Sequence, residues 1–219
     1  MRQKVLLIEK KLAGLYIWAT ELLYHPFAWI YETVAWMVSF GYWSQWRLDT
    51  LQYIKAGSVL EIGFGTGALL KTLKIKNVDV TGLEPSKQMQ RVASKRLEKA
   101  KLSVKRIRAQ AEAIPLKNNQ FDNVMATFPS NYILMPEILL EIFRVLKPSG
   151  RLVISGFGVW FHGGIKRRLT GWLLKSTYKE ALNLFLSVLS EVGFVVQVVE
   201  YRTDQYMLPV IIAEQTDGA

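Results

Sequence analysis

The sequence has no cysteine and only two histidines, His25 and His162. The lack of cysteine excludes disulfides, thiolate zinc sites, iron–sulfur ligation and cysteine nucleophiles, and two histidines argue against a His-rich metal centre, so we expect no metal site. Long apolar runs are also missing. Between residues 11 and 47 acidic residues and a His-Pro pair interrupt the apolar segments, and no window reaches the roughly 20 residues that a membrane span needs.

The first residues are basic and then apolar, as in a signal peptide, but two features of such a peptide are absent. Glu9 interrupts the start, and no small-residue cleavage site follows a clean apolar stretch. We therefore expect a cytoplasmic protein, with attachment to the membrane surface as a further expectation.

Apolar residues and positive charge are both abundant. Half of the 219 residues are hydrophobic, which is enough for a core and excludes disordered, collagen-like and low-complexity classes. The length favours one domain, or one domain with a small appendage. The formal net charge of +10 favours an anionic partner, either nucleic acid or an acidic membrane surface.

From residue 57 onward, β-like and helical segments alternate along the chain. Short apolar runs predict strands, amphipathic segments between them predict helices, and the last two strands are joined by a short turn that makes them antiparallel. The alternation predicts a doubly wound α/β domain with a mostly parallel seven-stranded sheet and helices on both faces. The expected strands are 58–62, 78–83, 104–109, 121–127, 152–155, 195–201 and 207–213.

Two segments stand outside this alternation. Residues 1–50 are helical in pattern and hold five of the seven tryptophans, which predicts an aromatic helical cap or lid. Residues 157–176 carry Trp160, Trp172 and several lysines and arginines but no acid, which predicts a basic amphipathic insert. We therefore expect the cap at 1–50 and the main domain at 51–219.

A glycine-rich turn follows the first expected strand, with Gly63, Gly65 and Gly67 at the point where a helix starts. Glycines permit a tight turn and let backbone N–H groups approach a ligand closely. Glu84 ends the second expected strand, about 20 residues further on, where a carboxylate can accept hydrogen bonds from both ribose hydroxyls. The glycine-rich turn and Glu84 together predict an adenosine-like cofactor at the carboxyl ends of the strands.

Several motifs in order resemble those of class I S-adenosylmethionine-dependent methyltransferases, and within that family the small-molecule and quinone-biosynthesis group. The resemblance covers about residues 50–219 and implies the Rossmann-like methyltransferase fold. The motifs that carry it are Glu61-x-Gly63-x-Gly65-x-Gly67, Gly82-Leu83-Glu84-Pro85-Ser86-Lys87-Gln88-Met89, Ala109-Gln110-Ala111-Glu112-Ala113-Ile114-Pro115-Leu116, Phe121-Asp122-Asn123-Val124 and Val145-Leu146-Lys147-Pro148-Ser149-Gly150-Arg151-Leu152.

The resemblance implies S-adenosyl-L-methionine as cofactor, with S-adenosyl-L-homocysteine as product. It places Glu84 on the ribose and Met89 against the adenine, although Met89 also suits an ordinary helix core. Gln110 stands where the family has aspartate, and its amide oxygen can still accept a hydrogen bond from the adenine amino group. The cofactor contacts implied by the motifs are Glu61, Gly63, Phe64, Gly65, Gly67, Glu84, Pro85, Met89, Gln110, Ala111 and Thr127.

Few side chains suit proton transfer at neutral pH. His162 lies just beyond a strand expected to end at the pocket, and His25 precedes a proline at a helix boundary. The resemblance adds Tyr31, because related enzymes carry a Tyr-acid pair near the cofactor and Tyr31-Glu32 occupies a comparable place. Residues 127–132 lack the Asn/Asp-Pro-Pro-Tyr pattern of amino-group methyltransferases, which argues against nucleic-acid bases as acceptors.

The aromatic N-terminus and the basic segments bear on the substrate. Residues 16–46 hold eleven aromatic residues, with Trp29, Thr33, Trp36, Phe40 and Trp43 at helical spacing. Four exposed rings would present about 600 Å² or more of apolar surface, so the parent sheet, a second subunit, lipid or an apolar substrate must cover them. Residues 85–108 carry a local charge of +8, which suits solvent, an anionic membrane or, less well, RNA.

These features predict a methyltransferase acting on a hydrophobic small-molecule or lipid-like acceptor, cytoplasmic and peripheral to the membrane, with a homodimer among the expected assemblies. The alternatives are an RNA methyltransferase and a non-catalytic S-adenosylmethionine-binding protein. A nicotinamide-dependent reductase is disfavoured because no Tyr-x-x-x-Lys occurs in the sequence.

Overall fold

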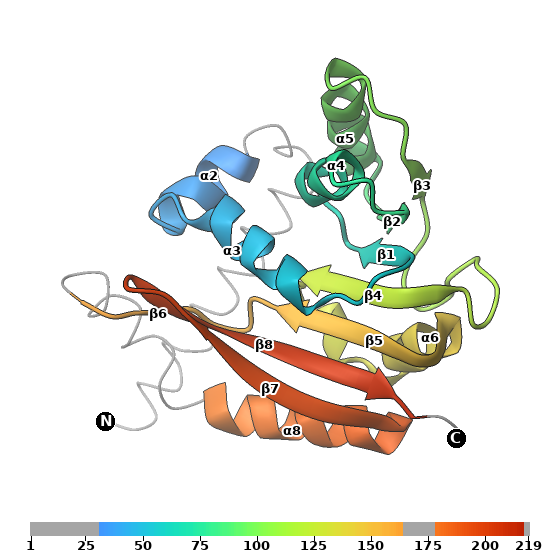
Figure 1. Ribbon diagram of the computed structural model, residues 1–219, viewed down its shortest axis with the longest axis vertical. Helices are drawn as coiled ribbons and strands as arrows, with labels where there is room; N and C mark the ends of the chain where they lie inside the picture. The colour runs from blue at the N-terminus through green and yellow to red at the C-terminus, as the bar shows by residue number, and fades with distance from the viewer. Residues whose placement is uncertain (1–30, 164–177, 217–219) are drawn as a thin grey trace, which may run out of the picture.

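The computed structural model describes residues 31–163 and 178–216 (Figure 1). Helices, including the single-turn helices η1 and η2, alternate with strands along most of this length. In chain order the elements are α2 (Tyr31–Val38), α3 (Trp43–Asp49), η1 (Thr50–Tyr53), β1 (Val59–Ile62), α4 (Ala68–Ile75), β2 (Val80–Leu83), α5 (Lys87–Lys99), β3 (Lys105–Ile107), β4 (Phe121–Thr127), η2 (Asn131–Leu134), α6 (Pro136–Val145), β5 (Leu146–Ser155), β6 (Trp160–Phe161), α8 (Tyr178–Val192), β7 (Phe194–Arg202) and β8 (Tyr206–Gln215).

One mixed sheet runs through the molecule in the order β3-β2-β1-β4-β5-β8-β6, with β7 also paired to β8. Strands β1 to β5 are parallel, and β8 is antiparallel to both β5 and β7. The seven expected strands, their parallel arrangement and the antiparallel last strand are confirmed. The two-residue strand β6 is an eighth, which was not predicted because so short a run carries no period.

Alternate residues of each strand face opposite sides of the sheet, and each side has its own apolar core. Leu60, Val124 and Leu152 pack on one face with residues of α6 and α8. Val59, Met125 and Val153 pack on the other face, with residues of α3, α4 and α5. Figure 1 shows these two helix layers on either side of the sheet. The expected helices on both faces are confirmed.

Two local features differ from the expectations. The expectation of one continuous helical stripe through Trp36 and Trp43 is wrong, because α2 ends at Val38. Phe40 (φ 53°) and Gly41 (φ 86°) then turn the chain before α3 begins. Residues 146–151, which precede the expected strand 152–155, belong to β5 itself. Their irregularity appears as a register shift in the pairing of β4 with β5.

The aromatic residues of α3 pack inside the protein. Trp46 is buried in the core on the α4 side of the sheet, and its ring lies near those of Tyr42, Phe128 and Tyr206. By contrast, Trp36 on α2 is 60% exposed. Among the helices that the structure describes, none is long and apolar enough to cross a membrane. The domain boundary at residue 50 and the basic insert stay predictions, since residues 1–30 and 164–177 lie outside the described residues.

Candidate functional site

The glycine turn joins β1 to α4 in a conformation that depends on its glycines. Gly63, Gly65 and Gly67 have φ angles of 68°, 53° and 71°, which side-chain-bearing residues rarely adopt. Gly67 is the N-cap of α4, and a Cβ there would lie 2.8 Å from the Cβ of Ala93 on α5. A Cβ on Gly65 would meet nothing within 4 Å. The turn is therefore tight where helices α4 and α5 meet and open at Gly65.

Glu84 closes over this turn from the end of β2. The Gly65 N–H donates to Glu84 Oε2 at 3.0 Å, and the Ser86 N–H donates to Oε1 at 2.9 Å. The side chain therefore points at the turn and not into solvent. The residue is only 2% exposed, so a ligand reaches it only after the groups that cover it move.

Glu61 is a second acid at the same end of the sheet. It is buried on β1, and its Oε2 has no hydrogen-bond donor among the described residues. Burial raises the pKa of Glu61 to about 8, partly opposed by the positive charge of Arg47 and reinforced by the negative charge of Glu84. A buried carboxylate oxygen without a donor is costly. It offers a binding position to an ammonium group or another hydrogen-bond donor.

Tyr132 covers the turn from η2, just after β4. Its hydroxyl would lie 2.7 Å from a Cβ placed on Gly63. Burial, together with the negative charges of Glu84, Glu61 and Glu112, raises the pKa of Tyr132, so the phenol is neutral at physiological pH. The tyrosine hydroxyl therefore lies against the turn at Gly63.

The other residues implied for the cofactor differ in their surroundings. Phe64 is buried beside Gly82, so its side chain belongs to the core and only its backbone faces the turn. Met89 is fully buried, and its N–H donates to the N-cap oxygen of Ser86 at 3.3 Å. Pro85 and Gln110 are exposed, Ala111 is buried and Thr127 is half-buried at the end of β4. These cofactor contacts stay predictions.

Of the three proposed catalytic residues, the structure describes the side chain of His162, which lies away from the turn. His162 is exposed beyond β6, and its N–H donates to the carbonyl of Gln205. Because β6 pairs with β8, strands β4, β5 and β8 separate it from β1, roughly 15 Å or more at the usual strand spacing. Tyr31 is the first residue of α2 but its side chain is not among those described, and His25 lies outside the described residues.

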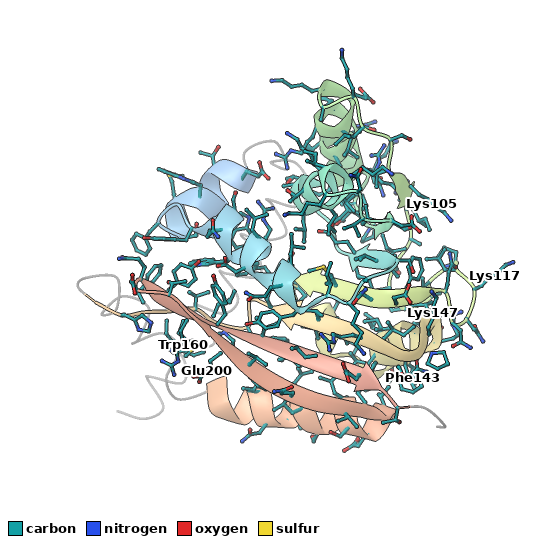
Figure 2. The ribbon with its side chains drawn as sticks, in the orientation of Figure 1. Lys105, Lys117, Phe143, Lys147, Trp160 and Glu200 are labelled. Atoms are coloured by element: carbon teal, nitrogen blue, oxygen red, sulfur yellow. The ribbon has the colours of Figure 1, made fainter. Side chains whose placement is uncertain are left out.

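A groove of about 920 Å³ lies at the amino ends of the parallel strands, opposite the glycine turn, among Lys55, Asp79, Lys105, Asp122 and Lys147. Figure 2 shows Lys105 and Lys147 here, and Trp160 of β6 at the other end of the sheet. Asp122 accepts hydrogen bonds from the Ser58 N–H and from Lys147. The charges of Asp122 and Lys147 therefore pair with each other and link β4 to β5.

Three groups near the turn were not assigned from sequence. Tyr132 lay within residues 127–132, the segment already compared with the pattern of amino-group methyltransferases, so its position in the sequence gave a usable signal. Arg47 and Arg96 gave none, because their relation to Glu61 and to the turn depends on how α3 and α5 pack.

Comparison with known proteins shows what this chain is similar to. Residues 60–154, from β1 to β5, match the family model for the methyltransferase domain. The demethylmenaquinone methyltransferase of Thermotoga maritima is 32% identical over 130 residues, covering 57% of this chain and 55% of the relative. A ubiquinone/menaquinone biosynthesis C-methyltransferase of Syntrophotalea carbinolica is 31% identical over 144 residues, covering 63% and 61%. The chain thus spans about three fifths of the length of these curated relatives.

The fold has relatives among solved structures. One from Methanococcus maripaludis, assigned as an S-adenosylmethionine-dependent methyltransferase, superposes with a TM-score of 0.59 at 22% identity and covers 89% of this chain and 92% of its own. The chain therefore has the fold of these structures, and its motifs are similar to those of class I S-adenosylmethionine-dependent methyltransferases. Within that class it is similar to the quinone-biosynthesis group.

Proposed function

We propose that the protein transfers a methyl group from S-adenosylmethionine to a hydrophobic small-molecule acceptor. The observation that carries this proposal is the closure of the Glu84 carboxylate on the glycine turn, with Gly65 N–H at 3.0 Å. Buried Glu61 supports it, because its Oε2 has no hydrogen-bond donor in the part of the chain that the structure describes. The Glu84 carboxylate suits ribose hydroxyls, and Glu61 suits an ammonium group. The residues present therefore fit an adenosyl amino acid.

The chemistry divides between cofactor and protein. When bound, S-adenosylmethionine supplies an already activated methyl group on its sulfonium. The protein's part is to bind, orient and exclude water. In our proposal, Glu84 and the turn hold the nucleoside, Glu61 holds the amino acid end, and Tyr132 shields the turn. A general base is needed only where the acceptor is not already nucleophilic.

The acceptor is proposed to be an apolar, quinone-like molecule. Support comes from the relatives, whose names refer to demethylmenaquinone and to ubiquinone and menaquinone biosynthesis. It also comes from α2, where Trp36 and Met37 expose 60% and 56% of their surfaces.

Isothermal titration with S-adenosylhomocysteine tests the cofactor part. We expect saturable heat at one site per chain, and no heat from well-folded protein would overturn the proposal. The acceptor is tested with methyl-labelled S-adenosylmethionine in a cell lysate. Label entering the organic extract supports the proposal, whereas label entering RNA or protein contradicts it.

We further propose that the protein works in the cytoplasm at the surface of an anionic membrane. The net charge of +10 and the exposed basic residues of α5, including Lys87, Arg91, Lys95 and Lys99, support this. In flotation with vesicles containing an anionic phospholipid, we expect protein in the top fraction at low salt and less at high salt. Protein that stays at the bottom at low salt defeats this clause and leaves methyl transfer untouched.

A further inference from the structure

Four charged or polar side chains from four separate elements meet behind the glycine turn, a group that we call the turn latch: Glu32 of α2, Arg47 of α3, Thr66 of the turn and Arg96 of α5. Arg96 Nη1 donates to Glu32 Oε1 at 2.8 Å, and its Nη2 donates to Glu32 Oε2. Arg47 Nη1 lies 3.8 Å from Glu32 Oε1. Helix α2 is thus tied to α5 by a two-pronged ion pair.

Thr66 brings the turn itself into this group. Its hydroxyl donates to Glu32 Oε1 at 2.7 Å and accepts from Arg96 Nη1 at 2.7 Å, and its carbonyl accepts from the same nitrogen at 3.1 Å. The side chain is 2% exposed. The hydroxyl and the carbonyl of Thr66 are therefore held by Glu32 and Arg96, whereas Glu84 holds the N–H of the preceding residue, Gly65.

The pair has the properties of a strong interaction and not of a loose surface contact. The side chains of Arg96 and Glu32 are only 24% and 35% exposed. Burial acts to raise the pKa of Glu32, but hydrogen bonds from Arg96 and Thr66 and the charges of Arg96 and Arg47 outweigh it, so the pKa is lowered. Glu32 is consequently ionised across the physiological range.

Thr66 stands between the two glycines on which the candidate cofactor site depends. The N–H of Gly65 is held by Glu84, and Gly67 caps α4. We propose that Glu32 and Arg96 are positioning residues that couple the docking of α2 to the conformation of the cofactor turn. Helix α2 and the turn then order together. The affinity for the cofactor depends on the Glu32–Arg96 ion pair, which need not touch the cofactor. The cofactor clause rests on the proposed function.

The coupling is testable first without any ligand. In hydrogen–deuterium exchange on the full chain, Glu32→Gln should raise exchange both in α2 and in residues 63–67. Glu98→Gln is the matched control, since Glu98 is exposed on the same helix as Arg96 and the substitution removes the same charge. Faster exchange in α2 alone, with the turn unchanged, would overturn the coupling and leave a merely structural ion pair.

The second arm measures the dissociation constant of S-adenosylhomocysteine by titration calorimetry. We expect Glu32→Gln and Arg96→Gln each to weaken binding about 5- to 50-fold, and Glu98→Gln to bind within about twofold of wild-type. The variant that combines Glu32→Gln with Arg96→Gln should bind no more weakly than whichever single variant binds more weakly. Non-additivity of this kind identifies two residues that act as a unit. Unchanged affinity in both single variants, or effects that multiply, would overturn the proposal.

The two arms separate failure of the latch from failure of the proposed function. If the wild-type protein binds no S-adenosylhomocysteine, the proposed function fails, and the exchange experiment still decides whether α2 and the turn are coupled. Thermal denaturation of each variant accompanies both arms. A melting temperature that falls equally in Glu32→Gln and Glu98→Gln, with no change in exchange at the turn, counts against the latch.

Discussion

At the scale of single residues, Glu84 has a dual task. In the structure its carboxylate accepts the N–H groups of Gly65 and Ser86, and in the proposed function it also accepts ribose hydroxyls. Its removal leaves donors without a partner, which costs about 1–3 kcal/mol for a buried group. We expect Glu84→Ala to weaken S-adenosylhomocysteine binding by roughly 10- to 100-fold, whereas Glu98→Ala leaves it unchanged. Wild-type affinity in a folded Glu84→Ala protein would remove Glu84 from the site.

Glu61 predicts a distinctive pH dependence of stability. Its pKa is raised to about 8 in the folded protein, against roughly 4.3 in an unfolded chain. The folded state therefore binds more protons between these values, and the wild-type loses stability from this residue as the pH rises from about 5 to 8. Because glutamine does not titrate, the stability of Glu61→Gln relative to wild-type should increase over that interval. Urea denaturation at pH 5, 6.5 and 8 measures it, and a constant difference would show that Glu61 is not the cause.

Tyr132 is expected to limit how fast a nucleoside enters. Its hydroxyl lies close to the turn at Gly63, and we expect the ring to move when a nucleoside binds there. We predict that Tyr132→Leu raises the association rate constant of S-adenosylhomocysteine several-fold in stopped-flow tryptophan fluorescence. Tyr132→Phe, which keeps the ring, should have a smaller effect. Equal rates in all three proteins would mean that the ring does not obstruct entry.

At the scale of elements, α2 and α3 differ although both come from the same aromatic segment. Trp46 of α3 is 5% exposed within a group of aromatic rings, whereas Trp36 of α2 is 60% exposed. Trp46→Ala should lower the free energy of unfolding by about 3–5 kcal/mol, as for other buried large-to-small changes. Trp36→Ala should change it by no more than about 0.5 kcal/mol. Denaturant titration of both variants tests this contrast, and equal losses would contradict the packing of α3.

The same elements mark what the sequence could and could not predict. Strands β1 and β2 were recognisable as short runs between turn residues that begin with valine and end with isoleucine or leucine. The structure buries all four residues of each strand, including the polar residues Glu61 and Thr81. The break between α2 and α3 was missed because periodicity passes over Phe40 and Gly41, whose positive φ angles are not visible in a spacing pattern.

At the scale of the whole molecule, local patterns predicted the fold and picked out the glycine turn and Glu84, but not the contacts that α2 and α5 make with that turn. Gly63, Gly65 and Glu84 were found because a turn and a strand end are local features with a chemical reason for their residue types. The latch was not found, since Glu32 and Arg96 are 64 residues apart and only the packing of α2 and α5 brings them together. The position of the Tyr132 hydroxyl against the turn was likewise invisible, because a motif does not say where a ring rests.

The position of β8 has a consequence for biosynthesis. This strand lies between β5 and β7, and β7 pairs with β8. During translation, β5 and β7 are therefore synthesised before β8, their shared pairing partner. Neither strand can form its hydrogen bonds to β8 until residues 206–215 emerge from the ribosome. Until then two neighbouring strand edges remain open to solvent and to other chains, which is the interval when a nascent sheet is most prone to aggregation.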